Sequence, residues 1–171
     1  MNEIVKNIGW FFGLVVFQIF ILDAIDLGLF STFFSPMIFS FFILRLKLET
    51  NVIRILIYSF LMGMTIDVFR DTIGLNTAAL LVVGITRSYY LSIISARDDF
   101  ESTLYLNFFT LGLVRFSLYF GLSIMTHHLM FFLLEEFSFV NFFSLLFKSF
   151  VNTAFALLIL VFLQYLLIQK K

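Results

Sequence analysis

The residues that could do chemistry in this chain are the few polar side chains that interrupt long apolar stretches. Asp67 lies near the end of one stretch, and Arg115, Lys148 and Asn152 lie inside two others. Ionisable residues in such stretches are costly and commonly mark substrate or proton pathways. An intramembrane aspartyl protease needs two facing acids, but Asp71 lies in the following turn and the other acids lie at the ends of stretches. We therefore expect no catalytic role for Asp67.

Other kinds of site are disfavoured by the residue types present. The chain has no cysteine, which excludes disulfides, thiolate metal ligands and cysteine nucleophiles. His127 and His128 are adjacent, so on a helix they point about 100° apart and make a poor metal pair. The metalloprotease, serine-hydrolase and phosphate-loop motifs do not occur. Eleven basic residues balance eleven acidic ones, which does not favour nucleic-acid binding. We expect no enzyme, cofactor or metal.

Composition places the chain in a bilayer. It is 61% apolar and 13% charged, with 27 phenylalanines among 171 residues, whereas soluble domains are about 45–50% apolar and about 25% charged. A helix needs about 20 apolar residues to cross the hydrocarbon core. We predict an all-α membrane protein with one integral membrane domain over residues 1–171. Its six transmembrane helices are expected at 7–23, 28–45, 52–69, 73–94, 103–126 and 140–167, with the last break from His127 to Ser138.

The distribution of basic residues predicts the orientation of these spans. Lysine and arginine near span ends are retained on the cytoplasmic side. With the N-terminus inside, Arg70 is the single basic residue of the outer connections. The cytoplasmic segments then carry Lys6, Arg45, Lys47, Arg54, Arg97, Lys170 and Lys171. We therefore predict that both termini are cytoplasmic.

The polar residues inside the predicted spans have more than one interpretation. Arg115 lies about eleven residues into the fifth span, where a charge costs about 2.5–3.5 kcal/mol. It either anchors a substrate or partner or pairs with an internal carboxylate such as Asp67. Lys148 and Asn152 share a helical face. They either line a cavity, pack against a neighbouring helix or bond the extracytoplasmic carboxylates Glu135 and Glu136. Arg87 is nearer a span end, where its side chain can snorkel to the interface.

Pro36 and the end of the third span predict local backbone features. Pro36 lies in the first half of the second span, where its ring and missing N–H are expected to kink the helix. Gly63 lies one turn before Asp67 on the same face, so a neighbouring backbone can approach closely. The Asp67 carboxylate is expected to accept hydrogen bonds from Thr72 or from the free N–H groups at the start of the fourth span. This arrangement is a capped helical hairpin.

The spacing of Gly63, Asp67, Gly74 and Leu75, followed by a helix that opens with small residues, resembles the rod shape-determining protein MreD family. Chain length, six predicted spans, Pro36 and a short basic tail agree with that resemblance. Spans two to four carry it, and the remainder matches in hydropathy.

The resemblance implies a non-catalytic scaffold in the bacterial inner membrane that serves cell elongation. MreD-like proteins work with MreC, a single-span periplasmic scaffold, near MreB filaments, the RodA glycosyltransferase and its class B penicillin-binding transpeptidase, and so help to position peptidoglycan synthesis. At the level of fold they resemble the membrane substrate-binding subunits of energy-coupling vitamin transporters. Carried onto this chain, the resemblance implies that a helix-packing surface or groove for the partner is shaped by Pro36, Gly63, Asp67, Gly74 and Leu75.

A second hypothesis belongs to a different functional class. In a small-molecule uptake subunit of an energy-coupling transporter, Arg115, Lys148 and Asn152 would line a substrate pocket open to the outer face. Such a protein would carry a tightly bound vitamin-type ligand, whereas a scaffold would be recovered with an MreC-like partner.

Overall fold

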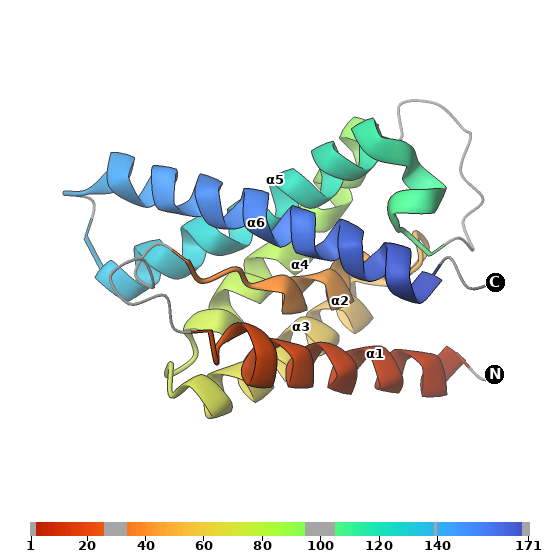
Figure 1. Cartoon of the computed structure of the whole chain (residues 1–171), viewed down its shortest axis with the longest axis horizontal. Helices are drawn as coiled ribbons and strands as arrows, with labels where there is room; N and C mark the ends of the chain where they lie inside the picture. Colours follow the sequence, from red (N-terminus) through yellow and green to blue (C-terminus); the bar gives the residue numbers. More distant parts are fainter. Residues whose placement is uncertain (1–2, 26–33, 95–104, 139, 169–171) are drawn as a thin grey trace.

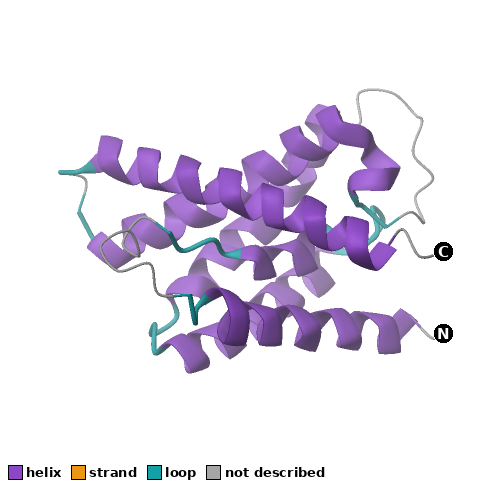
Figure 2. Ribbon diagram, in the orientation of Figure 1, coloured by secondary structure: helices purple, strands orange, loops and turns teal. Residues whose placement is uncertain are grey.

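The computed structural model describes residues 3–25, 34–94, 105–138 and 140–168, without the side chain of residue 168. Helices make up nearly all of this part of the chain (Figure 2). The order of the elements is α1 (Glu3–Phe17), the π-helix η1 (Gln18–Leu22), the 3-10 helix η3 (Ile38–Ser40), α2 (Phe41–Leu44), α3 (Val52–Arg70), α4 (Leu75–Ile94), α5 (Phe108–Glu136) and α6 (Phe142–Ile168).

Five helices in the described part of the chain are long and apolar enough to cross a membrane. They are α1 continued through η1, and then α3, α4, α5 and α6. Their presence agrees with the predicted multi-pass membrane protein. The bounds of α3 and α4 lie within two residues of the prediction, because Asn51 caps the start of α3 through its side chain and the chain turns sharply at residues 71–74.

The predicted second span is not a continuous helix. Of residues 28–45, the first six lie outside the described ranges, residues 34–37 are non-helical, and only residues 38–44 form the short η3 and α2 helices. Pro36 therefore precedes a helix and does not kink one, which corrects the sequence prediction. The proline has no N–H to donate and restricts the residue before it to extended conformations, so a helix cannot run through this point at low cost.

The chain alternates in direction along the bundle. Figure 1 shows that α1 begins and α6 ends at the same end, which we call the terminal end. The opposite, distal end contains the end of η1, the α3–α4 turn and the α5–α6 connection. Consecutive long helices α3, α4, α5 and α6 are the most extensively packed neighbours. Residues 34–44 pass through the middle, toward the terminal end.

Residues 34–44, which we call the second segment, form the centre of the core. Every residue from Met37 to Leu44 is at most 2% exposed. Phe41 lies between the Trp10 ring of α1 and the Phe120 ring of α5, at centroid distances of 5.6 and 5.5 Å, and Phe116 stacks on Phe120 at 4.4 Å. The long helices thus use one face to enclose this segment, while many of their other apolar side chains point outward.

Helix α5 differs from the predicted fifth span in both bounds and shape. It begins at Phe108, where Asn107 and Thr110 form a reciprocal capping box, and it continues to Glu136. The predicted break from His127 to Ser138 is wrong, because both histidines are buried within the helix. Gly112, with φ 71° and ψ 169°, bends the chain after the first turn of α5. Only glycine enters this backbone region easily.

We predict that Gly112→Ala lowers the free energy of unfolding by about 1–3 kcal/mol, because an L residue is strained at this backbone conformation. Gly121→Ala on the same helix is the matched control, since a Cβ there would meet only the Leu157 Cδ1 at an ordinary 3.6 Å. Unfolding of both variants in mixed micelles measures the difference. Equal stability of the two variants would contradict the bend at Gly112.

Candidate functional site

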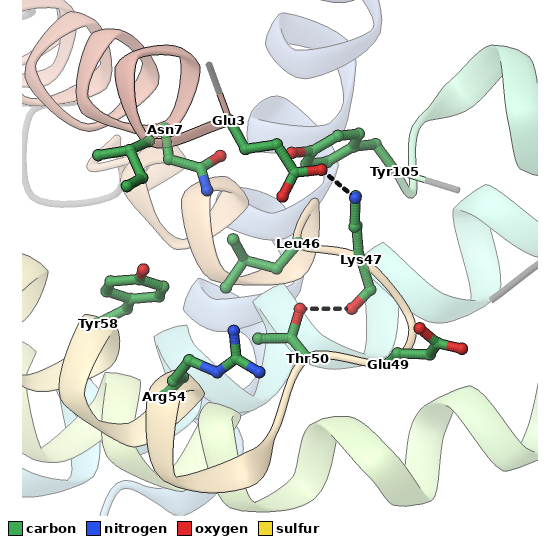
Figure 3. Close-up of a pocket in the computed structure, with 10 residues that line it drawn as sticks. Glu3, Asn7, Leu46, Lys47, Glu49, Thr50, Arg54, Tyr58 and Tyr105 are labelled. Carbon is green, nitrogen blue, oxygen red and sulfur yellow. Dashed lines mark hydrogen bonds and ion pairs between the residues drawn. The ribbon is translucent and has the colours of Figure 1, made fainter. Parts of the chain in front are cut away.

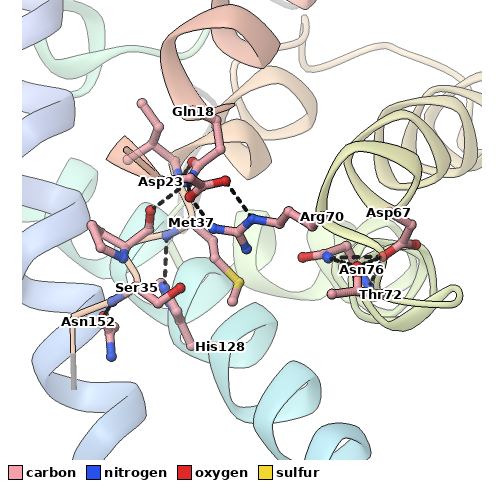
Figure 4. A network of polar contacts seen from close by, with 12 residues as sticks. Gln18, Asp23, Ser35, Met37, Asp67, Arg70, Thr72, Asn76, His128 and Asn152 are labelled. Atoms are coloured by element: carbon pink, nitrogen blue, oxygen red, sulfur yellow. Dashed lines mark hydrogen bonds and ion pairs between the residues drawn. The ribbon is translucent and has the colours of Figure 1, made fainter. Parts of the chain in front are cut away.

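The acid at the end of α3 is bound by the start of α4. Its Oδ1 accepts hydrogen bonds from the Thr72 hydroxyl at 2.5 Å, the Asn76 backbone N–H at 3.0 Å and the Asn76 side-chain amide at 2.9 Å. Its Oδ2 accepts from the backbone N–H of Thr77 at 2.9 Å and the Thr77 hydroxyl at 2.6 Å. Figure 4 shows Asp67, Thr72 and Asn76 together. The predicted capping of α4 by Asp67 is confirmed.

Gly63 is the residue that lets α3 and α4 approach each other. A Cβ added at Gly63 would lie 2.4 Å from the Thr77 Cα and 2.8 Å from the Thr77 backbone nitrogen. Gly63 and Asp67 therefore contact the same residue of α4 from successive turns of α3. The small-residue surface predicted at Gly63 packs within the chain.

The turn between α3 and α4 has left-handed backbone at three of its four residues, Asp71 (φ 55°), Ile73 (φ 27°) and Gly74 (φ 83°). The Leu75 N–H donates to the Thr72 carbonyl at 2.9 Å and starts α4. A β-branched residue rarely adopts a positive φ, yet Ile73 does so and its side chain is 96% exposed. We refer to residues 67–77 as the Asp67 corner. It presents one large apolar side chain beyond the ends of both helices.

Polar side chains from three other elements bind the non-helical backbone around Pro36. The Ser35 N–H donates to Asn152 Oδ1 of α6 at 2.6 Å, and the Met37 N–H donates to His128 Nε2 of α5 at 3.1 Å. Gln18 of η1 accepts from the Ile38 N–H at 3.0 Å and donates to the Pro36 carbonyl at 3.2 Å (Figure 4). Buried backbone groups need such partners where water is absent.

The structure thus assigns Asn152 to the second segment, and it identifies two residues that the sequence analysis missed, Gln18 and His128. His128 Nδ1 lies 3.0 Å from the Ile124 carbonyl, so the neutral ring donates there and keeps Nε2 as an acceptor for Met37. The sequence did contain a signal for these contacts. Gln18 and His128 are polar residues within apolar stretches, and Pro36 interrupts another apolar stretch. Nothing in the sequence pairs these positions.

The other end of the second segment is bound in the same way. The Tyr119 hydroxyl donates to the Leu44 carbonyl at 3.1 Å. Arg87 Nη2 donates to the carbonyls of Leu46 at 2.7 Å and Lys47 at 3.1 Å. Arg87 is 1% exposed, so the expectation that it snorkels to the interface is wrong. A cation at the end of a short helix satisfies carbonyls that have no helical partner.

Arg115 belongs neither to the Asp67 corner nor to the polar side chains that bind the second segment. It lies three residues beyond the bend at Gly112, near the terminal end of the straight part of α5, and it is exposed. Asp67 accepts its hydrogen bonds from residues of the Asp67 corner, not from Arg115. The suggested pair of Arg115 with Asp67 is therefore wrong. The sequence predicted mid-depth for Arg115 because the fifth span was expected to begin at residue 103 and to be straight. The helix instead begins at Phe108 and bends at Gly112.

A cavity of about 550 Å³ opens at the distal end. Arg70 and Asp23 form an ion pair in which the Arg70 Nε lies 2.7 Å from Asp23 Oδ2 (Figure 4). Lys148 Nζ lies 3.9 Å from Glu135 Oε2 and 4.0 Å from the centroid of the Phe132 ring. Aromatic side chains form much of the remaining wall. The full lining is Ile19, Asp23, Ser35, Phe69, Arg70, Thr72, Phe131, Phe132, Glu135 and Lys148.

A smaller cavity of about 280 Å³ lies at the terminal end (Figure 3). Lys47 pairs there with Glu3, and the hydrogen bond that the Lys47 ammonium donates to the Glu3 carboxylate raises the pKa of Lys47. The Arg45 guanidinium lies 4.7 Å from the Trp10 ring centroid and 5.0 Å from that of Tyr105, and burial lowers the pKa of Arg45 to about 10. Lys47 is thus held by an acid, and Arg45 lies against two aromatic rings.

The candidate uptake pocket is formed only in part. Of its three predicted residues, Lys148 lines the distal cavity, Asn152 binds the Ser35 N–H one helical turn further along α6, and Arg115 lies near the other end of the bundle. No protein-family model, curated protein or solved structure matches this chain.

We predict different effects on stability for substitution of the two adjacent histidines. His128→Leu leaves the buried Met37 N–H without its acceptor and lowers the free energy of unfolding by about 1–3 kcal/mol. His127 is also fully buried, but neither ring nitrogen has a hydrogen-bond partner among the described residues. His127→Leu is therefore expected to be neutral or stabilising. Equal losses in the two variants, measured by unfolding in mixed micelles, would contradict the assigned role of His128.

A second prediction concerns the close approach at Gly63. Gly63→Ala forces α3 away from the Thr77 backbone and is expected to cost about 1–3 kcal/mol of unfolding free energy. Gly13→Ala in α1 is the control, because the added Cβ would meet no described atom within 4 Å apart from its chain neighbours and its own helical backbone. The same unfolding measurement applies, and an unchanged Gly63→Ala protein would show that the two helices are further apart.

Proposed function

We propose that this chain is a non-catalytic scaffold of the bacterial cell-elongation machinery, resembling MreD, that binds an MreC-like single-span protein. The observation that carries the proposal is the Asp67 corner. All of its polar atoms named above serve to hold the α3–α4 turn in one shape, and that turn presents Ile73 at a strained positive φ with 96% of its side chain exposed. Strained, exposed residues held by a rigid surround are a feature of binding sites.

The hydrogen bonding of Asp67 supports a structural role over chemistry. A carboxylate that accepts five hydrogen bonds from residues of its own hairpin has both oxygens engaged. A proton carrier or general base instead needs an oxygen directed at the group with which it exchanges a proton. The acid in the motif that resembles MreD thus builds a surface.

The outer face of α3 supports a docking path for one helix. Apart from α4, α3 has only limited contacts with other elements. Large apolar side chains at helical spacing are exposed along this face and lead to the corner, namely Ile53, Ile57, Leu61, Met64 and Val68. A single transmembrane helix packed along them would bring its extramembrane part to Ile73.

The distribution of charge supports the side on which the partner would lie. Lys6, Arg45, Lys47 and Arg54 lie at or near the terminal end, and Arg70 at the distal end. The positive-inside rule then puts the terminal end in the cytoplasm and the Asp67 corner outside. An MreC-like protein has its folded part on that outer side of the inner membrane. MreB, RodA and the class B transpeptidase would be reached through this partner and the neighbouring membrane.

We expect Ile73→Asn to reduce recovery of the MreC-like partner severalfold without loss of folding, because asparagine tolerates a positive φ and removes only the apolar contact. Val140→Asn is the matched control, since Val140 is 89% exposed in the α5–α6 connection at the same end. Recovery is measured by co-purification of the two proteins from one membrane.

Crosslinking maps the docking path in the same complex. The chain has no native cysteine, so single cysteines at positions 57, 64 and 68 of α3 can be compared with cysteines at the exposed positions 147, 158 and 162 of α6. Disulfides or bifunctional crosslinks to the partner are expected from α3. Capture from α6 alone, or equal co-purification of the Ile73 and Val140 variants, would contradict the scaffold proposal as placed here.

The distal cavity favours a second candidate, the uptake subunit of an energy-coupling transporter. Its volume of about 550 Å³ is in the range of small-molecule sites. Under this alternative the purified protein would carry a tightly bound vitamin-type ligand, and Lys148→Met would release it. Recovery of an MreC-like protein without such a ligand favours the scaffold.

A further inference from the structure

The distal cavity joins an apolar wall to a charged rim. Ile19, Phe69, Phe131 and Phe132 provide apolar surface. The charged residues come from the ends of η1, α3 and α5 and from the second turn of α6. A helix of about 20 residues is long enough to cross a hydrocarbon core about 30 Å thick, so the ends of membrane-spanning helices lie in the headgroup region. A cavity with this position and lining suits the head and first carbons of an amphiphile.

The four charged groups of the rim are engaged to different degrees. Arg70 makes two hydrogen bonds to the Asp23 carboxylate, through Nε and Nη2, so this pair is largely neutralised. Lys148 lies 3.9 Å from Glu135, beyond the usual 2.7–3.2 Å of a hydrogen bond. Its other close neighbour is the face of the Phe132 ring. Lys148 is thus the cation of the rim whose charge is least matched by an acid.

The placement of Lys148 is unusual for a lysine in a membrane helix. It is the seventh residue of α6, about 9 Å from the helix start at 1.5 Å per residue. Lysines near helix ends normally extend toward the interface, but this side chain is 20% exposed and lies against Phe132 within the cavity. The Phe132 ring contacts the ammonium, and Lys148 lines the cavity. A side chain that already packs in this way loses less conformational entropy when it binds an anion.

We propose that the distal cavity binds a phosphate-bearing lipid headgroup, with the Lys148 ammonium as the group that contacts the phosphate. Ser35 lines the same cavity, and a serine hydroxyl can donate to a phosphate oxygen. Glu135 opposes an anion, and its side chain is 47% exposed at the end of α5, where it can turn toward water. Asp23 is held by Arg70. The proposal of this lipid site does not rest on the proposed scaffold function.

The test measures binding of short-chain lipids to the detergent-purified full chain by native mass spectrometry. Dihexanoyl phosphatidylglycerol is expected to bind, and dihexanoyl glycerol, which has no phosphate, to bind much more weakly. Lys148→Met is expected to weaken phosphatidylglycerol binding about tenfold or more, since a hydrogen bond to a charged group is removed. Lys148→Arg keeps the charge and is expected to restore binding. Arg54→Met, at the terminal end, is the control for loss of a cation.

A variant of opposite sign separates recognition from misfolding. Glu135→Gln removes the repelling acid and is expected to tighten binding of phosphatidylglycerol, which a damaged fold cannot do. Competition between inorganic phosphate and phosphatidylglycerol shows whether the site prefers a lipid or a water-soluble phosphate compound. Displacement at millimolar phosphate would show that a water-soluble phosphate ester is the occupant and overturn the lipid assignment. Equal binding of the two lipids, or a Lys148→Met protein with unchanged affinity, would overturn the site.

Discussion

The central constraint on this fold is that a stretch of non-helical backbone lies inside a bundle of apolar helices. Water cannot satisfy its N–H and C=O groups there, and each unsatisfied group costs several kcal/mol. Gln18, His128 and Asn152 meet this demand from η1, α5 and α6, and the one residue without an N–H is Pro36. Three elements that are distant in sequence are therefore fixed relative to one another by a few hydrogen bonds to the same four residues.

The same principle explains most of the polar residues in the spans. Asp67 satisfies the first N–H groups of α4, while Arg87 and Tyr119 satisfy carbonyls around the end of α2. These side chains act as substitutes for water at helix ends and breaks. Polar groups engaged in this way are not available for chemistry, so their presence in a membrane helix does not by itself indicate a reaction. In the described part of the chain, Ile73 on the Asp67 corner and Lys148 in the distal cavity do not serve a helix end or break in this way.

The sequence predicted the helices whose ends carry strong local signals. The apolar runs of α3 and α4 are interrupted by polar residues close to the ends of both helices, so hydropathy predicted their bounds, and the acid Asp67 before a short turn predicted the capping of α4. The Asn51 cap at the start of α3 was found in the structure. The structure of the second segment was not predicted, because hydropathy measures how apolar a stretch is and not whether it is one continuous helix. Residues 37–44 are nearly as apolar as a lipid-facing helix, although they are buried in the protein. The predicted depth of Arg115 was wrong for a related reason. A glycine such as Gly112 can lie within a straight helix or at a bend, and the sequence does not distinguish the two. The pairing of Asn152 with Ser35 depends on an approach across 117 residues, which no local pattern encodes.

The Asp67 corner and the distal cavity share a structural element, which connects the two proposals. Arg70 and Thr72 belong to the corner and also line the cavity, and Ile73 follows directly. A headgroup in the cavity would contact the inner side of the turn whose outer side presents Ile73. If occupancy favours the turn conformation that the partner binds, the two affinities rise together, because a coupling free energy between sites is reciprocal. A scaffold of the kind proposed above would then hold its partner most tightly where the membrane supplies the phosphate, and its assembly would depend on the local lipid.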